Sequence, residues 1–340
     1  MQTGTDGLMA LIVALAIMVM VVSCATLLIK NCAPWISASA PRAYAGAVGL
    51  TVFAMALMPF GLWLVGGLIV LLALRGGPVS DGRMAGLLGL ILALWLYSAA
   101  GVGPGPALLI AAAATVPALL LGRLLLRSGS LNLVFQLATL GALGFVLVVH
   151  VVLADPPGVW RPLVERVAGE LDRMGAVMST TGLARVQEEN FIQASAERMW
   201  GVVSWLLLLT AMISVFLGIY WQGRVEHVTR LAARFRELSA GRTLAAFAVL
   251  ALAGTVMFRS GLAADAALVL LGAFVLQGLA LLHAAHYAFG LGTAWLVAPY
   301  ALLFGGFTTA IMLIALAVSG FVDNWYPLRR WLPVPPAERG

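Results

Sequence analysis

The stretch that decides the fold is residues 131–154, which read LNLVFQLATLGALGFVLVVHVVLA and contain no Asp, Glu, Lys or Arg. An uncharged run of about 18 or more residues predicts a helix that spans a membrane. Five further runs share this property: residues 8–29, 46–74, 201–221, 266–289 and 293–319. The sequence therefore predicts that the bilayer is the main solvent of this chain.

Composition supports the same conclusion. The 340 residues are 62% hydrophobic and 10% charged, whereas soluble domains average about 45–50% and about 25%. Backbone groups in a bilayer must bond within helices or a closed barrel, and the alternation typical of barrel strands is absent. We expect an all-α polytopic transmembrane helical bundle of about 8–10 membrane segments, with a periplasmic helical hairpin.

The charges between the runs predict the orientation. Residues 155–198 hold seven acids against five arginines, and residues 224–242 hold five arginines against two acids. The positive-inside rule puts the second segment in the cytoplasm and the first outside, which is the periplasm if the chain lies in a bacterial inner membrane. The run 201–221 then runs inward. A short outer turn is expected around Arg259 and Asp265.

Several runs contain residues that break helices. Pro117 is expected to interrupt the helix 107–121, and Gly305-Gly306 is a plausible break in the last run. Residues 45–74 fit either a short hairpin broken at Met58-Pro59-Phe60-Gly61 or one long kinked helix, and we prefer the hairpin. The predicted organisation is an extra N-terminal helix and loop (1–44), a membrane domain (45–332) and a loose tail (333–340).

The outer segment 155–200 carries a heptad-like apolar seam before a second helix that begins near Leu183 and enters the membrane. The seam is formed by Trp160, Val164, Val167, Leu171, Met174 and Met178. It predicts either a surface for a partner or a cap over an outer cavity, or else a hairpin packed on itself or in the membrane interface. We favour the hairpin.

The inner segment 222–243 is also amphipathic, with Arg230 and Arg234 off its apolar face. It predicts an interfacial helix attracted to anionic lipid. The alternative is a docking surface for a cytoplasmic protein partner.

Polar side chains follow one face of the run 131–154. They are Asn132, Gln136, Thr139 and His150, and Gln277 is a candidate from another helix. Such a face predicts either a ligand-lining or proton-conducting surface, or ordinary hydrogen bonds to neighbouring helices. His283 and His286 share a face but have no nearby carboxylate or thiolate, so we predict no metal and no cofactor.

Other function classes lack their signatures. The chain has no catalytic set of the kind that metalloproteases, hydrolases or nucleotide-binding enzymes require, and its arginines form no stripe with aromatic residues. We therefore expect neither an enzyme nor a nucleic-acid-binding protein. Because none of the six main runs carries a charge, a pump with a buried carboxylate relay is disfavoured.

Six short stretches, in order, resemble the YybS-like multi-pass membrane proteins of bacteria over residues 43–332. They are Leu72-Ala-Leu-Arg-Gly-Gly, Leu126-Arg-Ser-Gly-Ser-Leu, His150 with Asp155-Pro-Pro and Trp160, Trp221-Gln with Phe235-Arg-Glu-Leu, Leu276-Gln-Gly-Leu-Ala-Leu-Leu-His283, and Gly320-Phe-Val-Asp-Asn-Trp-Tyr-Pro-Leu-Arg329-Arg330. That family has no established activity, and it is grouped by resemblance with the substrate-binding membrane subunits of energy-coupling-factor transporters. The resemblance implies a helical bundle with an outer small-molecule cavity and a cytoplasmic C-terminus.

Two functions follow from these observations. The first is a small-molecule-binding or transport-type membrane subunit whose cavity is lined by the polar residues named above. The second is a non-transporting scaffold or interaction protein that acts through its outer or inner amphipathic segment. The expected partners are the lipid bilayer, a small-molecule ligand and a membrane or cytoplasmic protein.

Overall fold

The computed structural model describes residues 27, 40–55, 61–75, 82–173, 182–226, 231–292, 294–304 and 307–333. The helix predicted for residues 8–29 and the tail after residue 333 lie outside this part of the chain, except for Leu27. Met174, Met178 and Arg230 lie outside it as well.

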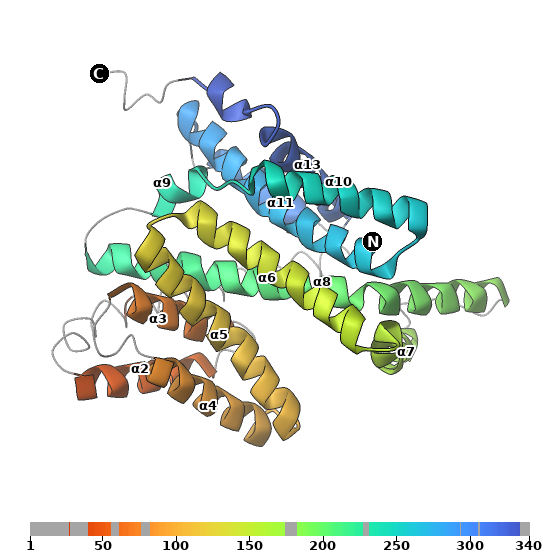
Figure 1. The fold of residues 1–340 in the computed structure, drawn as a ribbon, viewed down its shortest axis with the longest axis horizontal. Helices are drawn as coiled ribbons and strands as arrows, with labels where there is room; N and C mark the ends of the chain where they lie inside the picture. Colours follow the sequence, from red (N-terminus) through yellow and green to blue (C-terminus); the bar gives the residue numbers. More distant parts are fainter. Residues whose placement is uncertain are drawn as a thin grey trace.

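The described residues form helices and no strand, which confirms the all-α prediction (Figure 1). The helices are α2 (Ala40–Met55), α3 (Gly61–Arg75), α4 (Gly82–Ser98), α5 (Pro104–Ser128), α6 (Leu131–Val152), α7 (Pro156–Arg173), α8 (Gly182–Val225), α9 (Leu231–Arg236), α10 (Gly241–Phe258), α11 (Gly261–Ala288), α12 (Ala294–Phe304), α13 (Phe307–Asp323) and the 3-10 helix η2 (Leu328–Trp331).

Within these residues, five helices are long and apolar enough to cross a membrane: α5, α6, the Glu189–Val225 part of α8, α10 and α11. The bent pair α12 and α13 adds a sixth such span if it is counted as one. Three shorter apolar helices lie beside them: Ala45–Met55, Gly61–Arg75 and Gly82–Ser98. The chain is thus a multi-pass membrane protein built as a polytopic helical bundle.

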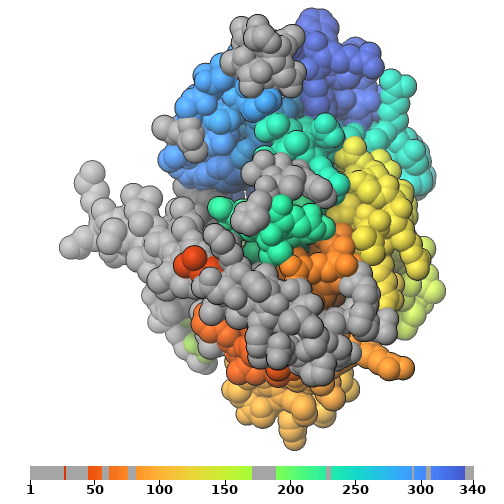
Figure 2. Space-filling view, turned by 90° about the vertical axis from the view of Figure 1, so that its left-hand side faces the viewer, coloured from red at the N-terminus to blue at the C-terminus, as the bar shows by residue number. Residues whose placement is uncertain are grey.

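Helix α8 is the central element of the bundle. It packs against α3 and α5 on one side and against α6 and α11 on the other, and it also contacts α7 and α9. In Figure 1 it runs through the middle of the molecule, from the end beside α7 to the end beside α9. We call these two ends the α7 side and the α9 side. Figure 2 looks onto the α9 side, where the green of α8 and α9 lies between the orange of α3 and the blue of α11.

Close contact between α3 and α8 depends on glycine. A Cβ atom on Gly66 would overlap the side chain of Ser214, and one on Gly218 would overlap Val70. Small residues let membrane helices approach closely, so that dispersion contacts replace contacts with lipid. Helix α3 is buried along most of its length. At about 1.5 Å per residue its 15 residues reach only about 22 Å, so it is a short core helix.

Helix breaks occur at two of the three predicted places. The run 45–74 is divided into α2 and α3, which pack on each other, and the last run is divided into α12 and α13; residues 56–60 and 305–306 between these helices lie outside the described part of the chain. The helices α12 and α13 meet at an angle of 114°. The predicted interruption at Pro117 is wrong, because Pro117 lies inside α5, which is one continuous helix of 25 residues. Proline costs a helix one hydrogen bond, and packing against α3, α4 and α8 offsets that loss.

Candidate functional site

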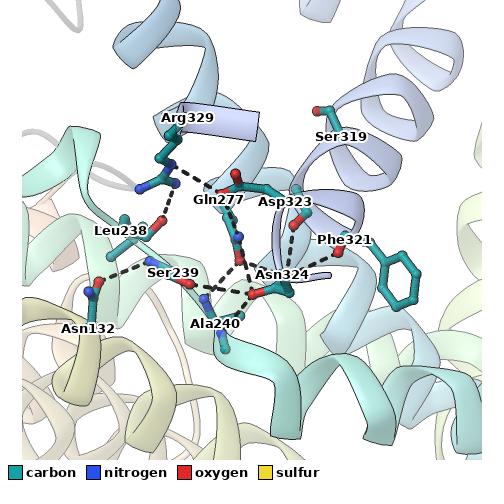
Figure 3. A network of polar contacts seen from close by, with 12 residues as sticks. Asn132, Leu238, Ser239, Ala240, Gln277, Ser319, Phe321, Asp323, Asn324 and Arg329 are labelled. Atoms are coloured by element: carbon teal, nitrogen blue, oxygen red, sulfur yellow. Dashed lines mark hydrogen bonds and ion pairs between the residues drawn. The ribbon is translucent and has the colours of Figure 1, made fainter. Parts of the chain in front are cut away.

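The loop that leads into α10 is held by amide side chains from α6 and α11 (Figure 3). The Ser239 backbone N–H donates to Asn132 Oδ1 at 2.9 Å, and Gln136 Nε2 donates to the Ser239 carbonyl at 3.5 Å. The Ala240 N–H donates to Gln277 Oε1 at 2.8 Å. These bonds satisfy backbone groups that would otherwise be buried without partners.

Gln277 is the centre of this network and is completely buried. Besides the Ala240 N–H, its Oε1 accepts a hydrogen bond from Asn324 Nδ2 at 3.3 Å. Its Nε2 donates to Asp323 Oδ2 at 3.2 Å and to Asn324 Oδ1 at 3.3 Å. A glutamine amide has two donor hydrogens and an oxygen that accepts two bonds, so protein partners use its whole capacity.

Asn324 links α13 to the loop that leads into α10, because its side chain both accepts and donates hydrogen bonds. Its Oδ1 accepts from the Gly241 N–H at 2.9 Å, and its Nδ2 donates to the Gly320 carbonyl at 2.9 Å. Gly241 has φ +82°, in the left-handed region that glycine adopts without strain. This conformation lets the loop turn sharply into α10 while its N–H points at Asn324.

An ion pair extends the network to the end of the described chain. Arg329 Nε lies 3.1 Å from Asp323 Oδ2, and Arg329 Nη2 donates to the Leu238 carbonyl at 2.6 Å. Burial lowers the pKa of the Arg329 guanidinium from its ordinary value, and the charges of Asp323 and Glu237 oppose that effect. The pair therefore secures residues 328–331 against the same loop.

Two glycines bring α11 and α13 close enough for this network to form. A Cβ atom on Gly278 would overlap the Leu316 carbonyl oxygen, and one on Gly320 would overlap the Phe274 carbonyl oxygen. Beside this contact the rings of Phe274 and Phe321 pack edge to face, with centroids 5.5 Å apart. The Gln277-Gly278 stretch and the closing Gly320 to Arg330 stretch of the sequence therefore meet at one place.

The structure brings three of the five predicted ligand residues together. Asn132, Gln136 and Gln277 converge on the loop 238–241, and each bonds to protein. Thr139 is buried, and its Oγ1 donates to the Phe135 carbonyl of its own helix at 2.9 Å. His150 lies 18 residues along α6 from Asn132, about 27 Å at 1.5 Å per residue. The polar face of α6 is thus divided between two separate sites.

The second site is a buried carboxylate on the α7 side. Asp265 is completely buried, and its Oδ2 lies 3.5 Å from His150 Nε2. The expectation that Asp265 lies in a turn is wrong, because α11 begins at Gly261 and Asp265 is its fifth residue. Ser260 caps the helix by accepting from the Ala263 N–H, so the turn consists of residues 259–260. The candidate span α11 therefore contains a buried acid, which lies one residue before the uncharged run 266–289.

The outer segment forms the predicted pair of helices, which are α7, beginning at Pro156, and the first part of α8. Trp160 and Val164 are half-buried, Ala168 is buried, and Val167 is 50% exposed. Ala168 therefore occupies the packed position that the seam assigned to Val167. Leu171 lies in the last turn of α7. The helix α8 continues from the outer segment into the membrane without a break, as predicted.

Three aromatic residues hold α7 to the bundle. The Trp200 ring packs edge to face on Trp160, with centroids 5.2 Å apart, and on Phe145, with centroids 6.1 Å apart. The Trp200 indole N–H also donates to the Pro156 carbonyl at 2.9 Å. This cluster joins the start of α7 to both α6 and α8.

The inner segment differs from the single amphipathic helix predicted for it. Its helix α9 has six residues, and Leu238 beyond it is completely buried. Arg234 is half-buried, and the Phe235 ring packs on His283 with centroids 5.4 Å apart. His283 Nε2 also lies 2.9 Å from the Tyr300 hydroxyl. Among the described residues, no group of three His, Cys, Asp or Glu side chains could hold a metal ion.

Residue patterns alone missed several members of the two sites. Asp323, Asn324 and Arg329 lie in the closing stretch that carries the family resemblance, but no periodicity singles them out. Ser239 takes part mainly through its backbone, which leaves no signal in a sequence. The Ser260 cap before an apolar run is the one signal that could have placed Asp265 inside a helix.

No family model, no curated protein and no solved structure matches this chain.

Proposed function

We propose that this protein is a membrane-embedded interaction subunit. Its working surface is the outer projection, which we define as α7 together with residues 182–200 of α8. The proposal places this projection outside a bacterial inner membrane, because arginines predominate in the segment at the other end of α8. The partner is a second membrane or extracytoplasmic protein.

The observation that carries the proposal is the length of α8. Its 44 residues extend about 66 Å at 1.5 Å per residue, whereas a hydrocarbon core is about 30 Å thick. The helix extends beyond α7 at one end of the bundle (Figure 1). A helix needs only about 30 Å of its length to cross the hydrocarbon core. The outer part of α8 is therefore not needed for anchoring and is available to contact a partner.

The projection is firmly joined to the bundle. The Trp160–Trp200–Phe145 cluster and the Trp200–Pro156 hydrogen bond fix α7 across α8, and α8 packs on α3, α5, α6 and α11. Aromatic pairs of this geometry contribute about 0.5–1.5 kcal/mol beyond the area they bury. A rigid surface loses less entropy on binding than a flexible one.

The surface of the projection combines apolar and charged groups. Phe191 is 59% exposed, and the Arg161 guanidinium lies near the carboxylates of both Glu165 and Glu189. Exposed aromatic residues surrounded by polar side chains are typical of protein interfaces.

Photo-crosslinking in native membranes tests the proposal. A benzophenone amino acid replaces Phe191 in one variant and Phe258 in the matched control. Phe258 ends α10 on the same side of the bundle and is 76% exposed. We expect a discrete protein adduct from position 191 and only lipid adducts from position 258. An absence of protein adducts at position 191, or the same adducts at both positions, would refute the proposal.

A second candidate is the small-molecule-binding or transport-type subunit that the family resemblance implies. The observation that favours it is Asp265, because ionisable side chains buried in membrane spans often lie on substrate or ion pathways. Native mass spectrometry of the purified protein tests it. A bound small molecule that is lost from Asp265→Asn supports this candidate, and its absence from the wild type contradicts it.

A further inference from the structure

The His150–Asp265 pair has a geometry that depends on where its protons lie. Both imidazole nitrogens of His150 have close neighbours. Nδ1 lies 3.0 Å from the Val146 carbonyl oxygen one turn earlier in α6, and Nε2 lies 3.5 Å from Asp265 Oδ2 in α11.

The first contact determines which nitrogen carries the hydrogen. A carbonyl oxygen has no proton to give, so Nδ1 must be the donor in the Nδ1–Val146 hydrogen bond. In a neutral imidazole with its hydrogen on Nδ1, Nε2 is a bare acceptor. A bare Nε2 and an ionised carboxylate would then face each other with lone pairs on both sides.

Burial makes such an arrangement costly. Neither Asp265 oxygen has a hydrogen-bond donor among the described residues, and the backbone of Gly201 approaches Asp265 without meeting hydrogen-bond geometry. An isolated buried carboxylate is so unfavourable that it normally becomes neutral or gains a cationic partner. One additional proton provides either solution. On Nε2 it makes an imidazolium beside a carboxylate, and on Oδ2 it makes a carboxylic acid that donates to Nε2.

We propose that His150 and Asp265 share one proton, and that the pair is a proton-binding site open to the aqueous phase on the α7 side. The His150 side chain is 17% exposed while that of Asp265 is fully buried, so protons enter and leave through His150. His150 lies two residues before the end of α6. Asp265 is likewise near the start of α11.

The charged groups near the pair come from α8 and from the turn that follows α10. From α8, Arg198 acts on Asp265 through its charge. From α10, residues 243–258 contribute no charged side chain, and Arg259 lies in the following turn. Gly201, which lies against Asp265, directly follows Trp200, the residue that anchors α7. The proton site is therefore directly beneath the outer projection.

Solid-state NMR of the full-length protein in lipid bilayers tests the proposal. The sample carries 15N-histidine and 13C-aspartate labels, and the chain has only four histidines. His150→Gln assigns the His150 signals by their loss. We expect a protonated Nδ1, and we expect the His150 Nε2 and the Asp265 carboxyl signals to shift together when the one shared proton is lost, because both groups sense the same proton.

Two substitutions test further whether His150 and Asp265 share the proton. In Asp265→Asn, which keeps the size of the side chain, we expect the shared transition to disappear from the His150 signals. The same substitution at Asp155, which is exposed, should leave that transition in place. A His150 with its only hydrogen on Nε2, or separate midpoints for His150 and Asp265 in the wild type, would overturn the proposal. The wild-type measurements decide this even if the variants fail to fold.

Discussion

Replacing Gln277 with leucine tests the role of the polar network. Leucine is similar in size to glutamine but cannot form hydrogen bonds. The change removes four bonds: one from the Ala240 N–H, two with Asn324 and one to Asp323. Asp323 keeps Arg329, and Asn324 keeps Gly241 and Gly320. The buried Ala240 N–H is therefore the group that is left without its hydrogen-bond acceptor.

The expected magnitude follows from these losses. A buried donor left without a partner costs about 1–3 kcal/mol. Each of the other three bonds contributes about 0.6 kcal/mol, the average measured between helices in a membrane protein. We therefore expect Gln277→Leu to lower the free energy of unfolding by roughly 3–5 kcal/mol. Part of that loss will be returned by the apolar leucine side chain.

The assay is unfolding in mixed micelles by sodium dodecyl sulfate, followed by tryptophan fluorescence. Gln136→Leu is the matched control, because it makes the same chemical change at the neighbouring helix. Gln136 is only half-buried and forms a single long bond of 3.5 Å, so we expect a loss below about 1 kcal/mol. Equal losses at the two positions would refute the idea that the loop is held mainly through Gln277.

Three further substitutions test other contacts. Gly320→Val places methyl groups against the Phe274 carbonyl and should separate α11 from α13, so we expect a lower thermal unfolding temperature. Ser319→Ala is the control, and equal unfolding temperatures for the two variants would contradict the close approach of the helices. Trp200→Phe removes the hydrogen bond to the Pro156 carbonyl and should increase the rate of proteolysis near α7, with little change in the unfolding temperature of the bundle. An unchanged rate of proteolysis would show that other contacts hold α7. Asp323→Asn removes the carboxylate that pairs with the half-buried Arg329, so we expect a loss of about 2 kcal/mol in the free energy of unfolding. The double variant Asp323→Asn with Arg329→Gln should partly restore it, and no loss in the single variant would mean that the pair is solvated.

Hydrophobic runs and helix-breaking residues predicted much of the fold. The division of residues 45–74 into α2 and α3 and of the last run into α12 and α13 follows from local chain chemistry, which a sequence records directly. The prediction at Pro117 was wrong because the cost of the proline, about 3 kcal/mol, is small against the packing of α5 on four other helices, α3, α4, α6 and α8. Tertiary contacts, which no local pattern reveals, decided that case.

The candidate sites were harder to predict for a related reason. The polar residues of α6 were identified, but their partners are the backbone of Ser239 and a buried acid at the start of α11. Backbone groups are the same at every position, and an acid beside a turn resembles any solvated loop charge. Only the packing of α6 against α11 shows that His150 and Asp265 meet.

The most direct test of the proposed function is recovery of the partner with and without the exposed aromatic residue of the projection. The partner is first identified through the adduct at position 191 and is then quantified by mass spectrometry after affinity purification of wild type and Phe191→Asp. Because Phe191 is 59% exposed, the bundle should keep its stability. We expect recovery to fall by roughly tenfold or more, since central interface aromatics contribute about 2 kcal/mol or more. Undiminished recovery from a stably folded Phe191→Asp variant would contradict the account.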